Sequence, residues 1–140
     1  MVTEEAFPLM PLEDGVEQYR SEAGGLGVIH FRDLTFTPRR IYWLFDTPVG
    51  LERGWHAHKS LEQYLLCLSG QVQVELDNGD RTEIHELHGS TPGIHITPGH
   101  WRILRNMNPE TIVLVLASED YEPSDYIFDY EEFKAWTRGT

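Results

Sequence analysis

The sequence predicts an all-β protein of one domain, residues 1–140, built as a β-barrel with a short C-terminal helix. Turn signals rich in Gly, Pro, Asn and Asp recur at short intervals, with runs rich in β-branched and aromatic residues between them. Several runs alternate apolar and polar residues with period two, which is typical of half-buried strands. Strands this short and numerous indicate a sandwich or a barrel, and the sequence favours the barrel.

Eight runs are expected to be strands, in addition to the segment that carries His56 and His58. In chain order they are GVIHF (27–31), RRIYWLFD (39–46), YLLCLSG (64–70), VQVEL (72–76), RTEIHEL (81–87), GIHIT (93–97), WRILRN (101–106) and TIVLVLAS (111–118). The clearest hairpin joins VQVEL to RTEIHEL, because Asn78 and Gly79 suit the positive φ angles of a type I′ turn.

Only the C-terminal stretch SDYIFDYEEFKAW, residues 124–136, has a helical pattern. Ser124 or Asp125 is the expected N-cap, and apolar or aromatic residues follow at a spacing of three. The overlapping acidic run EDYEPSDYIFDYEE, residues 119–132, is expected on a solvated face outside any site, since it would repel a phosphorylated ligand.

Composition excludes several classes of protein. The formal net charge of −12 opposes a nucleic-acid surface or an anionic membrane surface. No apolar run approaches the roughly 18–20 residues of a membrane span, and the first residues lack a signal-peptide pattern, so we expect a cytoplasmic protein. The single cysteine, Cys67, excludes an internal disulfide and is expected to be buried.

The few basic residues are unevenly placed. Six of the eleven Lys and Arg fall in short segments that also hold His56, His58 and His100. These six are Arg39, Arg40, Arg53, Lys59, Arg102 and Arg105. Positive charge gathered around one histidine cluster suits a small anionic ligand.

His56 and His58 lie two residues apart, so on a regular strand both side chains face the same way. The stretch from Gly50 to Gly70 resembles the first motif of the cupin superfamily, which places an acid after its His-x-His pair. The spacing puts that position on Gln63, whereas Glu62 would face the opposite side of the strand.

The metal expected of many cupins is not predicted. A divalent cation needs about three convergent ligands, and Gln63 is a weak neutral one. The second cupin motif supplies the last ligand, a histidine, and the only histidine in the segment GHWRILRN is His100. The resemblance described next implies a histidine directly after the tryptophan, where this sequence has Arg102, whose charge would repel a cation. We therefore predict no metal and no cofactor, and assign the two histidines to ligand binding or proton transfer.

From Arg40 to about Asp129, the sequence resembles the sugar 3,4-ketoisomerases that act on thymidine-diphosphate-linked 4-keto-6-deoxyglucose. The run RGWHAHKSLEQ carries the resemblance, together with VELDNG, GHW, VLVLAS and YEPSDYIFDYEEF. The resemblance implies a jelly-roll-like cupin barrel, a homodimer that exchanges N-terminal strands, metal-free chemistry, and a role in deoxysugar biosynthesis for a lipopolysaccharide O-antigen or S-layer glycan.

Moving a ketone between C4 and C3 requires proton transfers through an enediol, and a neutral imidazole is a suitable base near neutral pH. We expect His58 to be the carbon base, with His56 orienting it or relaying the oxygen proton. The enediolate would be stabilised by Arg53, Gln63 or Tyr42, and the diphosphate would be bound by Arg40 and Arg102. Trp101 could stack on thymine, although a core position is the alternative, and His100 is a further candidate for substrate binding. The residues leave the C4 configuration of the product open.

Two other classes of function remain open at this level. One is a metal-dependent cupin enzyme, such as a dioxygenase or a sugar isomerase, which would be favoured by a glutamate at position 63 and a histidine at position 102. The other is a non-catalytic sugar-binding cupin, which would need no paired acid–base groups.

Overall fold

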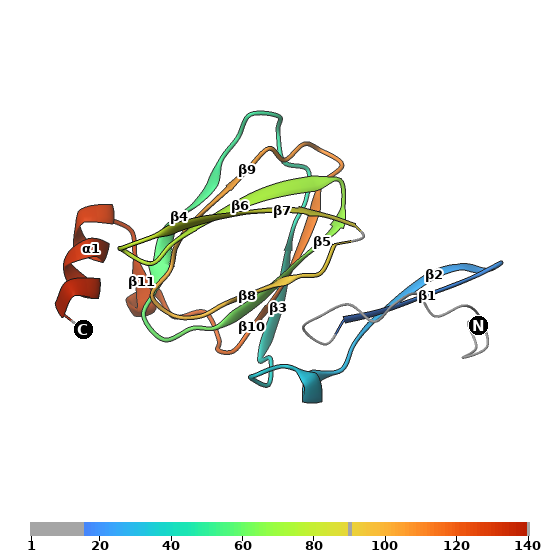
Figure 1. Ribbon diagram of the computed structural model, residues 1–140, viewed down its shortest axis with the longest axis horizontal. Coiled ribbons are helices and arrows are strands. Elements are labelled where there is room, and N and C mark those ends of the chain that lie inside the picture. Colours follow the sequence, from blue (N-terminus) through green and yellow to red (C-terminus); the bar gives the residue numbers. More distant parts are fainter. Residues whose placement is uncertain (1–15, 90, 140) are drawn as a thin grey trace.

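The computed structural model describes residues 16–89 and 91–139, whose strands form a two-stranded hairpin and two larger antiparallel sheets that face each other (Figure 1). The first of the larger sheets has the order β3 (Arg40–Leu44), β10 (Ile112–Ala117), β5 (Gln63–Ser69) and β8 (Ile94–Ile96). The second has the order β11 (Tyr126–Ile127), β4 (Arg53–His58), β9 (Trp101–Arg105), β6 (Gln71–Asp77) and β7 (Thr82–His88).

The predicted all-β class is confirmed, but the predicted closed barrel is wrong. Among the described residues, no ladder of backbone hydrogen bonds joins the two sheets, so the arrangement is a cupin-like sandwich. Period-two patterning shows which face of a strand is buried, but it does not show whether the edge strands of two sheets pair with each other. The alternation of apolar and polar residues therefore could not distinguish a barrel from a sandwich.

The main core fills the space between the sheets. Along β6, Val72, Val74 and Leu76 are buried while the intervening residues are more exposed, as the alternation predicts. Leu65 of β5 and Val113 of β10 pack into the same cluster from the facing sheet. This aliphatic core supports one part of the sandwich and leaves the remaining interior to polar side chains.

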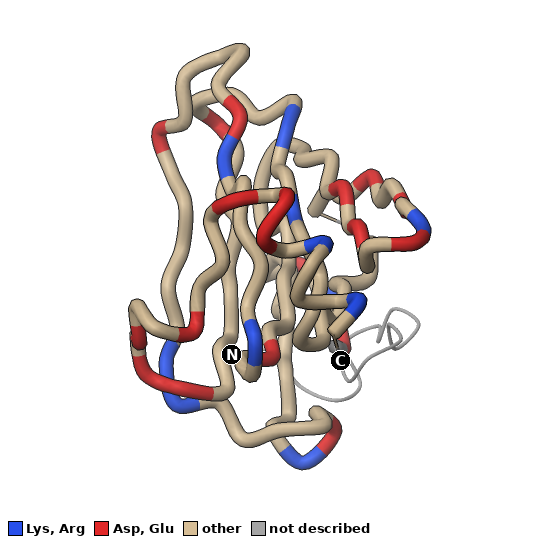
Figure 2. The backbone as a smooth tube through the Cα atoms, turned by 90° about the vertical axis from the view of Figure 1, so that its left-hand side faces the viewer, with Lys and Arg blue, Asp and Glu red and all other residues tan. Residues whose placement is uncertain are grey.

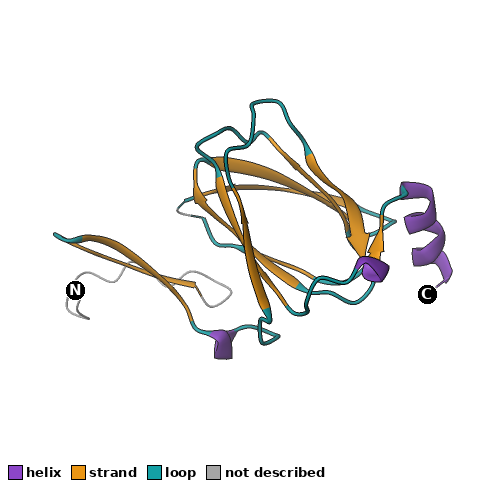
Figure 3. Ribbon diagram, turned by 180° about the vertical axis from the view of Figure 1, so that it is seen from behind, coloured by secondary structure: helices purple, strands orange, loops and turns teal. Residues whose placement is uncertain are grey.

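A separate hairpin precedes the sandwich. It consists of β1 (Val16–Ser21) and β2 (Gly24–Ile29), and the 3₁₀ turn η1 (Phe31–Asp33) follows it. Figure 3 shows this hairpin at the opposite end of the molecule from the C-terminal helix. β1 and β2 pair only with each other within the described residues.

The predicted C-terminal helix exists but begins later than expected. Residues Pro123–Asp125 form the 3₁₀ turn η2, Tyr126–Ile127 form β11, and α1 spans Tyr130–Gly139. Asp129 caps α1, because its Oδ1 accepts hydrogen bonds from the backbone N–H groups of Glu131 and Glu132 at 2.8 and 3.2 Å. Neither Ser124 nor Asp125 is the cap.

The hairpin between β6 and β7 is confirmed, but its turn is not of type I′. Four residues, 78–81, connect the strands, and the Asn78 N–H donates to the Arg81 carbonyl oxygen at 3.1 Å. A type I′ turn needs two successive positive φ angles. Here only Gly79 has one, at +93°.

Charged residues of both signs lie around the molecule, and Figure 2 shows acidic positions distributed over several loops with Lys and Arg among them. Cys67 is buried, as expected. Within residues 16–89 and 91–139, no helix is both long and apolar enough to cross a membrane.

Candidate active site

A bulge in β4 positions the histidine pair. Gly54 and Trp55 both have positive φ angles, +101° and +54°, and the pairing of β4 with β9 shifts register between Gly54 and His56. A Cβ atom at position 54 would lie 2.7 Å from the backbone oxygen of Arg102, so only glycine fits there. After the bulge, His56 is paired with Arg102 across the ladder.

As predicted, His56 and His58 share one face of β4. Their rings lie edge to face, with centroids 4.9 Å apart and planes at 87°. His56 is half-buried, whereas His58 is only 1% exposed. The two imidazoles therefore have different access to the interior.

A cavity of about 310 Å³ lies between the two sheets beside this pair. Six of the predicted site residues line it: Arg40, Tyr42, Arg53, His56, Gln63 and Arg102. The other lining side chains are Leu44, Leu65, Leu104, Val115, Tyr121 and Tyr126. The structure thus brings together residues of β3, β4, β5, β9, β10 and β11 that are far apart in the sequence.

His56 has the properties of a neutral base. Its Nδ1 lies 2.8 Å from the carbonyl oxygen of Gly54, and because a carbonyl only accepts, Nδ1 carries the proton. Burial, and next the positive charge of Arg102, lower the pKa of His56 to about 4, although the Gly54 contact opposes this. At neutral pH the ring is uncharged, and its Nε2 has a free lone pair.

His58 lies directly behind His56 and is held by Asp125. Its Nδ1 is 3.0 Å from Asp125 Oδ2, and its Nε2 is buried without a hydrogen-bond partner among the described residues. Burial lowers the pKa of His58 to about 3, with further contributions from Arg102 and His56, while Asp125 opposes the shift. This imidazole is also neutral near pH 7.

Arg102, Gln63 and Tyr42 form a polar chain across the cavity. Arg102 is 3% exposed; its Nη1 donates to Gln63 Oε1, and its Nη2 donates to the backbone oxygen of His100 at 3.1 Å. Gln63 Nε2 in turn donates to the hydroxyl of Tyr42 at 2.8 Å. Burial lowers the pKa of Arg102 to about 10, so the guanidinium remains a cation at neutral pH.

The donor set at this position does not fit a metal ion. In the part of the chain that the structure describes, no three His, Cys, Asp or Glu side chains converge as ligands. Gln63 and Arg102 occupy the positions where the cupin pattern expects an acid and a histidine, and the guanidinium is itself a cation. The residues present are therefore a poor ligand set for a divalent cation, and metal-free chemistry stays a prediction.

Aromatic residues of the C-terminal segment complete the site, and none of them was among the residues predicted for it. The ring of Tyr126 lies 5.0 Å from that of His56 and 4.3 Å from that of His58, between centroids. Phe128 stacks on Tyr126 at 5.2 Å, and Tyr121 also lies 5.7 Å from Tyr126. The aromatic residues that follow the last long strand were the available signal.

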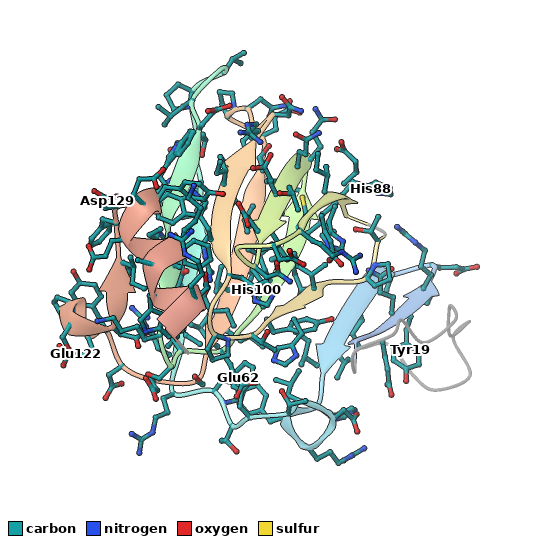
Figure 4. All side chains as sticks on the ribbon, turned by 60° about the vertical axis from the view of Figure 1, so that its left-hand side comes forward. Tyr19, Glu62, His88, His100, Glu122 and Asp129 are labelled. Atoms are coloured by element: carbon teal, nitrogen blue, oxygen red, sulfur yellow. The ribbon has the colours of Figure 1, made fainter. Side chains whose placement is uncertain are left out.

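The expectation that the acidic stretch lies outside the site is wrong for Asp125. Figure 4 shows the segment between Glu122 and Asp129 leading up to α1. The turn η2 directs Asp125 back toward β4, where His58 contacts it. Hydrogen bonds from Ser60, Leu61 and His58 stabilise the ionised carboxylate at this position.

Besides His58, which lies next to the cavity lining without being part of it, two predicted residues do not reach the cavity. Trp101 packs on the outer face of β9, with its ring centroid 5.9 Å from that of Phe133, so the core alternative applies and thymine stacking by Trp101 is wrong. His100 lies in the turn before β9 and contacts Thr97, with its Nδ1 3.0 Å from the Thr97 carbonyl oxygen (Figure 4). Glu62 faces outward, as predicted, and contacts His95 at 2.9 Å.

Comparisons with known proteins identify the family of this chain. The family described as "FdtA: WxcM-like, C-terminal" matches residues 14–138. A TDP-4-oxo-6-deoxy-alpha-D-glucose-3,4-oxoisomerase from Aneurinibacillus thermoaerophilus is 36% identical over 105 residues, which cover 75% of this chain and 76% of the relative.

Solved structures give the same result. QdtA, a sugar 3,4-ketoisomerase from Thermoanaerobacterium thermosaccharolyticum solved in complex with TDP, is 32% identical with a TM-score of 0.85, covering 89% of this chain and 92% of its own. A 3,4-ketoisomerase from Helicobacter canadensis is also 32% identical, with a TM-score of 0.84 and coverage of 89% and 95%. On its sequence, its fold and the extent of these matches, this chain belongs to the FdtA family.

Proposed function

We propose that this protein is a nucleotide-sugar 3,4-ketoisomerase of deoxysugar biosynthesis. Its substrate is a thymidine-diphosphate-linked 4-keto-6-deoxyhexose, and the keto group moves between C4 and C3. The observation that carries the proposal is a pair of neutral imidazoles, His56 and His58, beside the buried guanidinium of Arg102 in a cavity between two sheets. The relatives named above have this activity.

The carbon base is His56, which reverses the order expected from the sequence. His56 borders the cavity and its Nε2 is free to take a proton, whereas His58 is buried behind it. His58 transfers the proton between the two sugar oxygens. Its Nε2 has no hydrogen-bond partner among the described residues, and the rings next to it, His56 and Tyr126, line the cavity.

The chemistry balances without an external oxidant. His56 removes the C3 proton, the electron pair forms a C3–C4 double bond, and the C4 oxygen takes a proton to give an enediol. The C3 hydroxyl then loses its proton, and the electron pair left on that oxygen forms the new C3 carbonyl. At the same time the electron pair of the C3–C4 double bond takes up a proton at C4. The hydrogen removed from one carbon is thus replaced at the next.

The developing enediolate is stabilised by the cation and hydroxyl groups of the cavity. Arg102 supplies a fixed positive charge in a buried setting, where its effect is stronger than in water. Burial raises the pKa of Tyr42, which keeps its phenol protonated and able to donate. Gln63 holds both groups in place through its two hydrogen bonds.

The diphosphate is assigned to Arg40 and Arg53, which line the more accessible part of the cavity. Arg102, which was expected to bind the diphosphate, is too deeply buried for this role. We assign it instead to stabilising the enediolate. The exposed rings of Tyr121 and Phe128, which are 61% and 67% exposed, replace Trp101 as the residues proposed to stack on the nucleobase.

A homodimer with exchanged N-terminal strands, located in the cytoplasm, completes the proposal. The hairpin of β1 and β2 forms no ladder with either sheet of the sandwich within the described residues. Between this hairpin and the outer face of the first sheet lies an apolar hollow of about 330 Å³, lined in part by Ile29, Ile41 and Leu114. Light scattering should report a dimer at micromolar concentration; a fully active monomer would contradict this part.

The test is incubation with the thymidine-diphosphate-linked 4-keto sugar in deuterated water, followed by proton NMR. A ketoisomerase gives the 3-keto product, with deuterium introduced at carbon to the extent that the catalytic protons exchange with solvent. Protein stripped with a chelator should react at the same rate, which separates this function from a metal-dependent cupin enzyme. Tight binding of the sugar without conversion would instead support a non-catalytic sugar-binding protein.

A further inference from the structure

Main-chain contacts hold Asp125 beside the end of β4, next to the histidine that it contacts. Its backbone oxygen accepts a hydrogen bond from the Lys59 N–H at 3.0 Å. The next residue, Tyr126, pairs with His58 in the ladder between β11 and β4. The position of this aspartate relative to His58 is therefore set by main-chain hydrogen bonds.

The carboxylate itself is held by several donors. Oδ1 accepts from the Ser60 N–H and from the Ser60 hydroxyl, each at 2.8 Å, while Oδ2 accepts from the Leu61 N–H at 3.3 Å and lies 3.0 Å from His58 Nδ1. The Asp125 side chain is 9% exposed. Burial would raise the pKa of Asp125, but the hydrogen bonds from Ser60, His58 and Leu61 outweigh it and lower the pKa. The group is an ionised acceptor in a fixed orientation.

This geometry determines which nitrogen of His58 carries the proton. An ionised carboxylate can only accept, so the neutral ring must present its single N–H at Nδ1. The lone pair is then at Nε2, the buried atom that lacks a partner among the described residues. We propose that Asp125 is a positioning residue that fixes the Nδ1–H tautomer of His58 and so keeps Nε2 ready to exchange the sugar hydroxyl proton.

The inference rests on the proposed function, but its central claim concerns the free protein. The competing explanation is purely structural, since Asp125 also ties down residues 59–61. Asp125→Asn separates the two, because the amide oxygen can keep the bonds from Ser60 while the NH₂ group faces His58 Nδ1. A donor at that place favours the Nε2–H tautomer instead.

The expected result for Asp125→Asn is a fall in kcat of at least about 10²-fold, with KM changed by less than about threefold. The matched control is Asp129→Asn, the same substitution four residues along, at the exposed cap of α1. This control should keep the wild-type kcat. A wild-type kcat in Asp125→Asn would overturn the inference.

NMR of protein with ¹⁵N-labelled histidine reads the tautomer directly, with His58→Asn identifying the signals. We expect Nδ1–H for His58 in the wild type and Nε2–H in Asp125→Asn. An Nε2–H ring in the wild type, or an unchanged tautomer in a variant that only melts earlier, would leave Asp125 with a structural role and refute the inference. The wild-type spectrum decides the matter even if Asp125→Asn fails to fold.

A double variant tests whether Asp125 acts through His58. In the His58→Asn background, adding Asp125→Asn should change kcat by less than about twofold, because the group being positioned is already absent. A further large loss would mean an independent role. If the wild type does not convert the keto sugar at all, the proposed function fails, while the tautomer measurement still decides the role of Asp125.

Discussion

The two faces of the β4–β9 ladder have opposite environments, one apolar and one polar. On the outer face, Ala57, Trp101 and Ile103 are buried beneath the C-terminal segment, with Phe133 of α1 fully buried among them. On the inner face, His56 and Arg102 border a cavity. Neighbouring residues of the same strand thus have opposite environments.

The difference shows what each face contributes. Apolar burial on the outer face stabilises the fold by roughly 25 cal/mol per Å² removed from water, whatever the detailed arrangement. A buried polar face is stable only if its groups are paired, and on the inner face Arg102 Nε and His58 Nε2 have no partner among the described residues. Unpaired polar atoms beside a cavity indicate a surface organised for a ligand rather than for stability.

Replacing the histidines of the inner face should have the largest effect on activity. His56→Asn should lower kcat by roughly 10²–10⁴-fold, since a positioned acid–base group contributes that much, while the melting temperature changes little. His58→Asn should also lower kcat. Melting temperature and kcat should both be measured for each variant. If both variants melt at lower temperature but keep the wild-type kcat, the two histidines have only a structural role.

The outer face should respond in the opposite way. Phe133→Ala should lower the free energy of unfolding by about 3–5 kcal/mol, because it leaves a cavity in a fully buried cluster. The kcat per folded molecule should not change. Denaturant unfolding measures the free energy of unfolding, and active-site titration gives kcat per folded molecule. The control is Phe45→Ala, at a side chain that is 59% exposed. Its free energy of unfolding should lie within about 0.5 kcal/mol of the wild-type value. A large loss of kcat in Phe133→Ala would show that the faces are coupled.

The smallest effect concerns the pH dependence of the inner face. Burial, and next the charge of Arg102, lower the pKa of His56 to about 4, so wild-type kcat/KM should hold well below pH 6.5. Arg102→Met removes the positive charge, which favours protonated imidazole, and the acid limb of kcat/KM should move up toward pH 6.5. Arg102→Lys keeps the charge and should keep the limb at low pH. If Arg102→Met and Arg102→Lys have the same pH dependence of kcat/KM, the charge of Arg102 does not lower the pKa of His56.

Several features of the site could be predicted because they depend only on local spacing. The common face of His56 and His58, and the inward Gln63 beside an outward Glu62, follow from the period of a strand. The absence of a suitable acid and a last histidine argued against a metal from residue chemistry alone. The same reasoning predicted most of the strands and the hairpin at Asn78–Arg81.

Other features required the tertiary structure, because they depend on contacts between distant residues. Asp125 is 67 residues from His58, and no local pattern shows that the turn η2 returns to β4. The strand period places Trp101 and Arg102 on opposite faces but does not say which face is inward; α1 decides this by covering Trp101.

By itself, then, the sequence determined the all-β class, the paired histidines and the chemistry that they can perform, since strand periodicity and side-chain chemistry are local properties. Only the tertiary structure decided that the sheets form a sandwich, that His56 rather than His58 borders the cavity, and that an aspartate from the acidic tail orients the second imidazole. Those outcomes depend on how sheets pack and which segments meet, and packing energy is shared among residues far apart in the chain.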